Sequence, residues 1–143
     1  MLTNFKRVLC PVQFDDKNSE AALAVAKEIV QQNNGKLFVL NVVSPHTDPT
    51  RVGGAAMAAH DEKVAEREMA RLKREMLAGV EHETILLIGN PAEEIVKAEH
   101  DYGADLVVMA THGRTGVSHL VLGSVAERVV RESSCPVLTI RPK

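Results

Sequence analysis

Short runs of β-branched and other apolar residues alternate with longer segments of helical periodicity throughout the chain. Five of these runs are expected to be strands: residues 7–12, 37–43, 84–88, Leu106–Ala110 and Val137–Ile140. Because the runs are almost continuously apolar, we expect the strands to be covered on both faces. This order predicts an α/β fold, with an open parallel sheet, right-handed crossovers and helices on both sides of the sheet.

Four helices are expected between the strands, at residues 19–32, 57–78, 91–102 and 124–133. Gly35 is expected to take the left-handed conformation that ends the first helix. In the second helix, apolar residues recur at helical spacing from Ala65 to Val80, which predicts one buried face and one charged, solvated face. Asn90 is expected to cap the third helix, with Pro91 at its first position.

The length of 143 residues is typical of one globular domain, so residues 1–143 are expected to form a single domain. Hydrophobic residues make up 45% of the chain and charged residues 25%, and no stretch approaches the roughly 20 apolar residues of a membrane span. These values exclude a disordered, a collagen-like or a membrane-spanning protein. With a net charge of −2, one Tyr, three Phe and no Trp, the chain is not expected to bind nucleic acid.

Cys10 and Cys135 each lie beside a proline in an apolar run, and the first residues lack the apolar segment of a signal peptide. We therefore expect a cytoplasmic protein in which both cysteines are reduced, buried and act as small hydrophobic residues. The six histidines form no spacing typical of zinc ligands, so no metal site is expected. A G-x-S-x-G elbow is also absent from the sequence, which argues against a hydrolase.

Glycines are densest in residues 110–124, between the fourth expected strand and the fourth expected helix. The first turn of a helix offers unsatisfied N–H groups and the positive end of the helix dipole, and glycines let a phosphate approach the backbone. The segment lacks both the Gly-Lys-Ser/Thr ending of a Walker A loop and the G-x-G-x-x-G fingerprint. It therefore predicts a different kind of phosphate site, in which His112, Arg114 and His119 are the cationic or titratable candidates.

Gly113 is followed, after nine residues, by Gly123 and Ser124. In this respect the chain resembles the universal stress protein family, whose nucleotide-binding members carry G-x-x-G, nine residues and G-[S/T] after the fourth strand. The resemblance extends along the whole chain, through the stretches at residues 8–12, 89–91, 105–109, 111–113, 122–127 and 135–141.

The resemblance implies a Rossmann-like fold of the adenine nucleotide alpha hydrolase type, with strand order 3-2-1-4-5. Ligands bind such sheets at the switch point, which here lies between the first and fourth strands. The resemblance also implies that the ligand is ATP, or AMP or ADP, with Val12, Val42 and Met109 around the adenine and the glycine segment at the phosphates. The binding residues expected from the resemblance and the loop composition are Pro11, Val12, Gln13, Val42, Met109, Ala110, His112, Gly113, Arg114, Gly116, Gly123, Ser124 and Val125.

Two residues depart from the family's nucleotide-binding pattern, which has an acidic residue at the position of Gln13 and a glycine at the position of Ala110. Gln13 can hydrogen-bond a ribose hydroxyl, but it lacks the carboxylate that a divalent cation prefers. The methyl group of Ala110 narrows the space for a close backbone approach. Asp15 or Asp16 is a possible replacement for the charge, although a turn or a helix start also explains them. Binding of Mg²⁺ stays open at this point.

Structural explanations stay open as well. Ser124-Val-Ala-Glu127 also fits a capping box, in which Ser124 only caps the fourth helix. Gly113 and Gly116 also fit turns that need a positive φ. His112 also fits the role of an ordinary hydrogen-bonded residue at the end of a strand.

The leading expectation is a stress-response protein that acts as a nucleotide-dependent regulatory homodimer, joined through the edge strand Val137–Ile140. One alternative is a slow ATPase or autophosphorylating enzyme that uses Ser118, His119 or Ser124. Another alternative is a protein-interaction dimer that binds no nucleotide, which the residues Gln13 and Ala110 favour.

Overall fold

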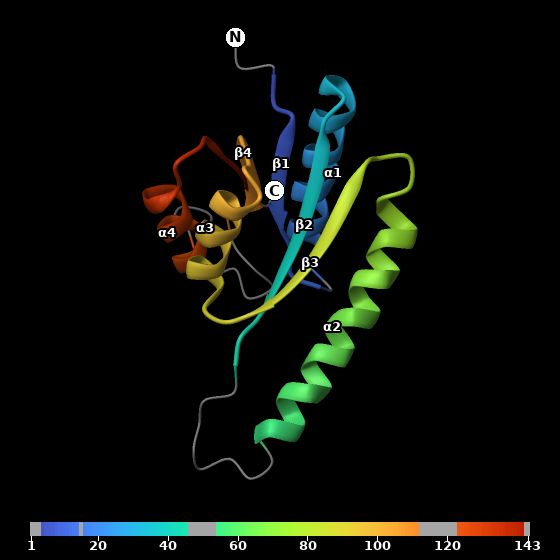
Figure 1. Ribbon diagram of the computed structural model, residues 1–143, viewed down its shortest axis with the longest axis vertical. Coiled ribbons are helices and arrows are strands. Elements are labelled where there is room, and N and C mark those ends of the chain that lie inside the picture. The colour runs from blue at the N-terminus through green and yellow to red at the C-terminus, as the bar shows by residue number, and fades with distance from the viewer. Residues whose placement is uncertain (1–3, 15, 46–53, 112–122, 142–143) are drawn as a thin grey trace.

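The computed structural model describes residues 4–14, 16–45, 54–111 and 123–141 (Figure 1). Its elements, in chain order, are β1 (Arg7–Pro11), α1 (Lys17–Asn33), β2 (Lys36–Val43), α2 (Gly54–Met76), β3 (His82–Ile88), α3 (Pro91–Asp101), β4 (Leu106–Ala110), α4 (Ser124–Glu132) and β5 (Val137–Ile140). The strands form one parallel sheet in the order β3-β2-β1-β4-β5. The predicted fold class and the strand order implied by the resemblance are therefore confirmed.

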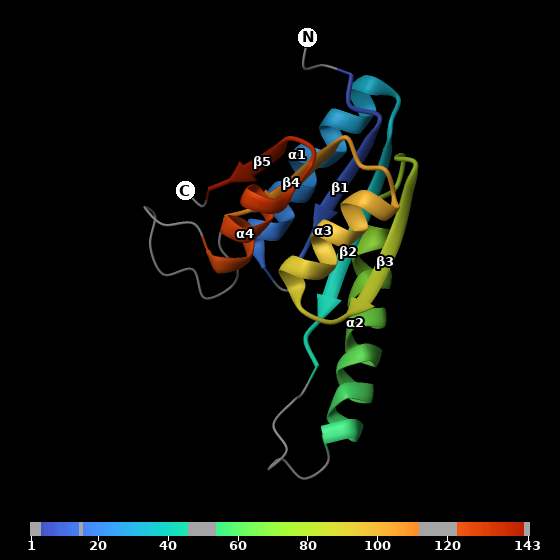
Figure 2. The ribbon, with the colours of Figure 1, turned by 60° about the vertical axis from the view of Figure 1, so that its left-hand side comes forward.

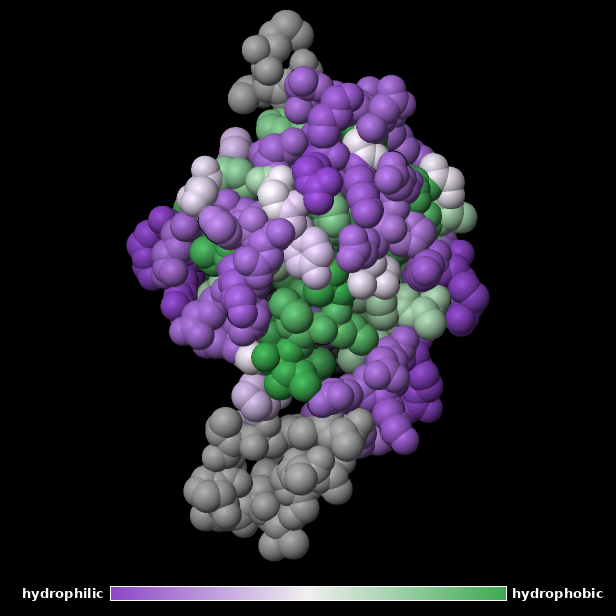
Figure 3. Space-filling model, viewed as in Figure 1, coloured by the Kyte–Doolittle hydropathy of each residue, from purple (hydrophilic) through white to green (hydrophobic). Residues whose placement is uncertain are grey.

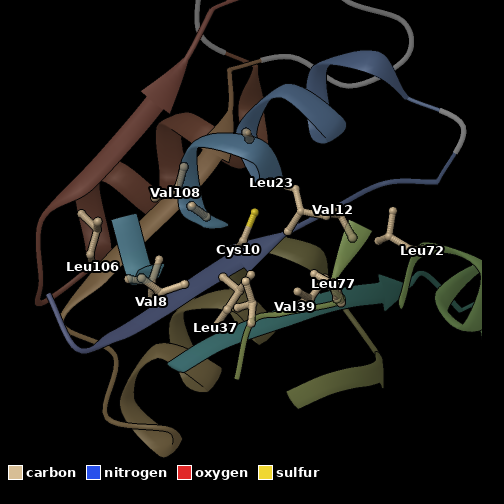
Figure 4. Packing of buried hydrophobic residues seen from close by; sticks show 14 of the residues in the cluster. Val8, Cys10, Val12, Leu23, Leu37, Val39, Leu72, Leu77, Leu106 and Val108 are labelled. Carbon is tan, nitrogen blue, oxygen red and sulfur yellow. The ribbon is translucent and has the colours of Figure 1, made fainter. Parts of the chain in front are cut away.

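Two hydrophobic clusters lie on opposite faces of the sheet. Figures 1 and 2 show α1 and α2 on one face and α3 and α4 on the other. Successive residues of β1 point to alternate faces: Val8 and Cys10 belong to the cluster under α1 and α2, and Leu9 to the cluster under α3 and α4. Figure 4 shows the first cluster, in which side chains of β1 and β2 lie against Leu23 of α1.

The central strands β1, β2 and β4 are covered on both faces as expected, whereas the edge strands β3 and β5 are only partly buried. Ile88 at the end of β3 is 52% exposed and Leu138 of β5 is 39% exposed. Figure 3 shows a hydrophobic area over the carboxyl ends of β2 and β3. The apolar sequence of an edge strand therefore overstates how much of it is buried, because the helices pack mainly over the middle of the sheet.

Asp105 joins the amino ends of β1 and β4. Its carboxylate accepts hydrogen bonds from the backbone N–H of Lys6 at 2.9 Å and from that of Arg7 at 3.1 Å. The backbone N–H of Asp105 donates in return to the carbonyl of Arg7 at 2.8 Å. Lys6 and Asp105 are 99 residues apart in the sequence, so this contact fixes the pairing of strands that are distant along the chain.

The end of α1 differs from the expectation. Asn34, with φ 53 and ψ 42, takes the left-handed conformation that was expected at Gly35. Asn adopts this conformation more readily than most residues do. Gly35 is required by space instead, because a Cβ atom at this position would lie 2.8 Å from the carbonyl oxygen of Lys6.

The start of α3 agrees with the expectation. The Asn90 side chain accepts a hydrogen bond from the N–H of Glu93 at 3.1 Å, and Pro91 lies in the first turn. Both features satisfy the geometry of a helix amino end.

The two cysteines are free, and the expectation that both are buried is correct for Cys10 and wrong for Cys135. Cys10 is fully buried, whereas Cys135 is only half-buried because it lies in the exposed turn between α4 and β5. Within the described residues, no helix is both long and apolar enough to cross a membrane.

Candidate functional site

The carboxyl ends of β1 and β4 lie side by side, because these strands pair in the centre of the sheet. After β1 the chain continues into α1 on one face, and β4 is followed by α4 on the opposite face. Open α/β sheets bind ligands at such a switch point, outside the carboxyl ends of the strands. This end of the sheet is therefore where a ligand site is expected.

Buried polar residues gather at the same end. The described part of the chain contains five buried polar or charged residues, and four of them lie near the carboxyl ends of β1, β2 and β4: Asp16, Ser19, Asn41 and Thr111. The fifth, Glu99, accepts hydrogen bonds from the backbone N–H groups of Ser134 and Cys135. Burial of polar groups costs free energy unless they are hydrogen-bonded, so this concentration indicates a region with a defined polar arrangement.

One peptide group at the end of β1 is held from both sides. The carbonyl of Val12 accepts a hydrogen bond from Asn41 Nδ2 at 2.8 Å, and the N–H of Gln13 donates to Ser19 Oγ at 2.9 Å. Ser19 Oγ in turn donates to Asp16 Oδ2 at 3.1 Å. We call Asp16, Ser19 and Asn41, with the Val12–Gln13 peptide that they hold, the β1 clamp.

Most of the β1 clamp is not evident in the sequence. Asp16 fits a helix start, and it does cap α1, by accepting from the N–H of Asn18 at 3.0 Å. The sequence pattern predicts Ser19 only as part of the first helix and Asn41 only as part of an apolar strand. The available signal was Asn41 itself, since a single amide inside a strand of aliphatic residues must find a partner when it is buried.

A shallow, solvent-open hollow lies beside Gln13. It is lined by Val12, Gln13, Phe14, Ser19, Glu20, Leu23, Arg71 and Leu72. The side chain of Gln13 is exposed at this surface. Hydrogen bonds and charge from Glu68, and further interactions with Glu75, raise the pKa of Arg71, so the guanidinium stays charged.

The amino end of α4 has no side-chain cap from the described residues. Gly123 is the N-cap, and its N–H donates to the carbonyl of Thr111 at 2.8 Å. Ser124 is exposed and lies inside the first turn, so the capping-box interpretation, with Ser124 as the cap, is wrong. Since the first N–H groups of a helix have no partner within the helix, this end can accept an anion.

Nine of the thirteen expected site residues fall within the described part of the chain. Val12 and Met109 are buried, Gln13 and Ser124 are exposed, and the others are half-buried: Pro11, Val42, Ala110, Gly123 and Val125. All nine belong to the carboxyl ends of β1, β2 and β4 or to the amino end of α4. The other four lie outside the described residues: His112, Gly113, Arg114 and Gly116. Among the described side chains, no group of three or more His, Cys, Asp or Glu could hold a metal ion.

Comparison with known proteins identifies related chains. A family model described as the Universal stress protein family matches residues 4–141. A universal stress protein of Thermus aquaticus is 37% identical over 139 residues, which cover 96% of this chain and 99% of that protein.

Solved structures share the fold over nearly the whole chain. The structure of MJ0577, a universal stress protein of Methanocaldococcus jannaschii, has a TM-score of 0.86 at 28% identity and covers 98% of both chains. A universal stress protein in complex with cAMP has a TM-score of 0.66 at 24% identity, over 96% of this chain and 97% of that one. A universal stress protein of Archaeoglobus fulgidus in complex with dAMP has a TM-score of 0.61 at 21% identity, over 97% and 99%.

Proposed function

Because its family model matches residues 4–141, the chain belongs to the universal stress protein family, and from this premise we propose that it binds an adenine nucleotide. ATP is the nucleotide that we expect, with AMP and ADP as the alternatives. The proposed site lies between the carboxyl ends of β1, β2 and β4 and the amino end of α4.

The amino end of α4 is the observation that carries the proposal. Its N-cap, Gly123, offers no side chain, and the N–H of Gly123 is already bonded to Thr111. The N–H groups of Ser124 and Val125, which follow in the first turn, have no partner within the helix, as in any helix, and can therefore donate to an external acceptor. Together with the helix dipole, they favour a phosphate at this position.

Apolar residues and the structural neighbours support an adenine base. Val12, Val42 and Met109 offer aliphatic and thioether side chains at the ends of three adjacent strands. Two proteins with the same fold were solved with cAMP and with dAMP, both of which contain adenine. These complexes support an adenine nucleotide as the class of ligand.

The residues in the described part of the chain do not fit a bound Mg²⁺. Hard divalent cations prefer carboxylate oxygens, and the position where the family's pattern has an acid carries Gln13. Asp16 is buried and already accepts hydrogen bonds from Asn18 and Ser19. We therefore propose that nucleotide binding does not require a metal ion held by the protein.

Ser124→Glu tests the site, with Ser124→Gln as the matched control. A carboxylate in the first turn of a helix interacts favourably with the helix dipole, so the fold should be kept, but the same charge repels a phosphate. We expect calorimetry to show ATP binding at least about ten-fold weaker for Ser124→Glu than for Ser124→Gln, from Coulomb repulsion near a protein surface.

Equal ATP affinity in the two Ser124 variants would overturn the assignment of the phosphates to α4. Absence of any measurable binding of ATP, ADP or AMP to the wild-type protein would overturn the proposed function itself.

We expect binding without efficient hydrolysis. Phosphoryl transfer needs charge neutralisation and a positioned nucleophile. The described residues of α4 include no lysine, and the carboxylate of its first turn, Glu127, accepts a hydrogen bond from Arg131. Typical enzymes turn over at about 10 per second, and we expect single-turnover phosphate release several orders of magnitude slower. Release near about one per second that is lost in Ser124→Ala would favour the slow-ATPase alternative.

We further propose that the chain acts as one domain in a cytoplasmic, nucleotide-dependent regulatory homodimer. The support for the dimer is β5, which lies at the edge of the sheet with Leu138 39% exposed. Unpaired backbone groups on such an edge favour pairing with another strand.

A further inference from the structure

We propose that Asn34 is a site of spontaneous modification, deamidation to aspartate or isoaspartate, and that the folded end of α1 suppresses this reaction. The dipeptide Asn34-Gly35 carries the chemistry, because glycine has no side chain to hinder the closure of a ring between the two residues. Nucleotide binding plays no part in the reaction. The chain is modified at Asn34 only while the end of α1 is open.

The nucleophile of the reaction is the backbone nitrogen of Gly35. This nitrogen gives up its proton to water and attacks Cγ of Asn34, so that a C–N bond forms and a succinimide ring closes. The Asn34 amide group takes up a proton and leaves as ammonia. Water then opens the ring at one of its two carbonyls, which gives either aspartate or isoaspartate. In isoaspartate the main chain runs through the former side chain. Water is the only other reactant.

The folded chain engages this nucleophile. The N–H of Gly35 donates to the carbonyl of Val30 at 2.8 Å, which is the hydrogen bond that closes a Schellman motif after α1. Asn34 is held at φ 53 and ψ 42, and ring closure requires rotation about ψ to bring the Gly35 nitrogen against Cγ. The bond to Val30 and the left-handed conformation of Asn34 therefore have to be given up before the ring can form.

Neighbouring residues hold the end of α1 in this arrangement. Lys6 Nζ donates to the carbonyl of Asn33, and the Asn33 side chain donates to the carbonyl of Ile29 at 2.9 Å. The N–H of Lys36 donates to the carbonyl of Lys6 at 2.7 Å, which ties the residue after Gly35 to the start of β1. Asn34 itself is exposed, so water reaches it, and the backbone hydrogen bonds provide the protection.

Isoaspartate at position 34 lengthens the main chain where there is no room for it. The extra methylene group lies between α1 and β2. A Cβ atom at Gly35 would already lie 2.8 Å from the carbonyl oxygen of Lys6, and Lys36 pairs with Arg7 at the amino end of β1 and β2. We therefore expect the modified chain to lose this end of the pairing and to melt at a lower temperature.

Mass spectrometry tests the proposal on the wild-type protein, incubated folded and in guanidinium chloride at the same pH and temperature. Trypsin releases residues 28–36 as one peptide, whose fragments distinguish Asn33 from Asn34. Chromatography separates the isoaspartyl form of the peptide. We expect Asn34 to be modified at least about ten-fold more slowly in the folded protein than in the unfolded one, since even a helix end opens only part of the time. Asn33, which no glycine follows, should be modified much more slowly than Asn34 in guanidinium chloride.

Hydrogen exchange provides an independent measurement of the same opening. The protection factor of the Gly35 amide in the folded protein should agree within about three-fold with the ratio of the two deamidation rates, because both reactions need the bond to Val30 to break. Lys6→Met removes the ammonium group that binds the Asn33 carbonyl, so it should lower both quantities by the same factor. Lys97→Met, the same change at an exposed lysine of α3, is the matched control and should alter neither.

Asn34→His separates modification at this residue from damage elsewhere. Histidine adopts the left-handed conformation more readily than most residues and has no amide group to lose. After prolonged incubation, we expect the melting temperature of the wild-type protein to fall in proportion to its isoaspartate content, while that of Asn34→His stays constant.

Each failure has a distinct meaning. Equal rates of deamidation in the folded and the unfolded protein would overturn the protection by the end of α1. Absence of modification at Asn34 in guanidinium chloride would overturn the site itself. An equal fall in the melting temperature of Asn34→His would overturn the assignment of the damage to this residue.

Discussion

Gly35 lies where a side chain would meet the backbone of a neighbouring segment. Its N–H donates to Val30 O, and the next residue, Lys36, donates to the carbonyl of Lys6 at 2.7 Å. An added Cβ would lie 2.8 Å from that same carbonyl oxygen, so the two segments would have to separate. Glycine is therefore required at position 35 because a Cβ atom does not fit there, and not because of the φ angle.

Gly35→Ala is expected to lower the free energy of unfolding by about 1–3 kcal/mol, the usual cost of overpacking. Gly79→Ala is a useful comparison, since Gly79 has φ +82 and no atom within 4 Å of the added Cβ. Its expected cost is about 1–2 kcal/mol, from backbone strain alone. Urea denaturation of the wild type and both variants measures these changes in the free energy of unfolding. If Gly35→Ala proved as stable as the wild type, the steric argument would be wrong.

Cys135 is expected to react slowly with alkylating reagents. Burial, with the nearby Glu99 carboxylate as a second cause, raises the pKa of the Cys135 thiol to about 12. Only the thiolate reacts, so iodoacetamide at pH 8 should label this residue much more slowly than a free cysteine. Glu99→Gln removes the charge but keeps an oxygen for the N–H groups of Ser134 and Cys135, and it should accelerate labelling. Mass spectrometry measures both rates, and an unchanged rate in Glu99→Gln would contradict the role of that charge.

The same pKa shift gives a dependence of stability on pH. The thiol of Cys135 has a pKa of about 12 in the folded chain against an ordinary value of 9.0, so the folded state retains its proton at higher pH. The contribution to stability is complete below pH 9 and is lost as the pH rises from 9 towards 12. Burial raises the pKa of the Cys10 thiol as well, which adds to the loss at alkaline pH.

At the scale of elements, the backbone N–H and C=O groups of β5 point in two directions: one set faces β4 and the other faces the open edge of the sheet. The carbonyls of Pro136 and Ile140 accept from Val107 and Thr111, so these residues face β4. Backbone groups alternate in direction along a strand, and the N–H of Thr139 therefore points away from β4, towards the open edge. This edge is the surface proposed to form the dimer.

Thr139→Pro is expected to give a folded monomer, because it removes an outward N–H and keeps the bonds to β4. Leu138→Pro is the contrasting variant: its N–H faces β4, so this change should lower the melting temperature as well. Light scattering at micromolar concentration, with thermal denaturation of each variant, tests both statements. A wild-type monomer, or a folded Thr139→Pro dimer, would contradict the proposed interface.

The order of the elements could be predicted from the sequence because strands and helices differ in length and periodicity. The strands expected at residues 106–110 and 137–140 have the observed bounds, and the central ones are within a residue. The ends of the helices were harder to predict than the strands, because two neighbouring residues can each serve as the cap. Examples are Asn34 and Gly35 after α1, and Gly123 and Ser124 at the start of α4. Which of the two leaves the helical conformation depends on contacts with segments that are distant in the sequence.

The site could be predicted only in part. The position at the carboxyl ends of β1 and β4 follows from topology, and topology is visible in the strand–helix order together with the resemblance. Of the β1 clamp, only the need of the buried Asn41 amide for a partner could be predicted. The partner itself could not, because the Val12–Gln13 peptide that Asn41 and Ser19 hold carries no sequence signal of its own.

At the scale of the whole molecule, ligand binding is expected to raise the stability of the entire fold. Free ATP at a hundred times its Kd should add about 2.7 kcal/mol to the free energy of unfolding. Thermal denaturation should show this increase in wild-type protein with EDTA or with Mg²⁺. In Gln13→Asp, which restores a carboxylate, the increase should depend on Mg²⁺. If the increase depended equally on Mg²⁺ in the two proteins, Gln13 would not be the reason why nucleotide binding needs no metal ion.

The contact of Asp105 with Lys6 and Arg7 has a consequence for synthesis on the ribosome. β1 is made first, yet its partner β4 begins only after Asp105, which is 99 residues later than Lys6. At typical translation rates, this is a delay of roughly 5–20 s. Throughout that interval one side of the future central strand has no partner, and unpaired strands readily associate with other chains. Nascent β1 is therefore exposed to such association until β4 has been synthesised and pairs with it.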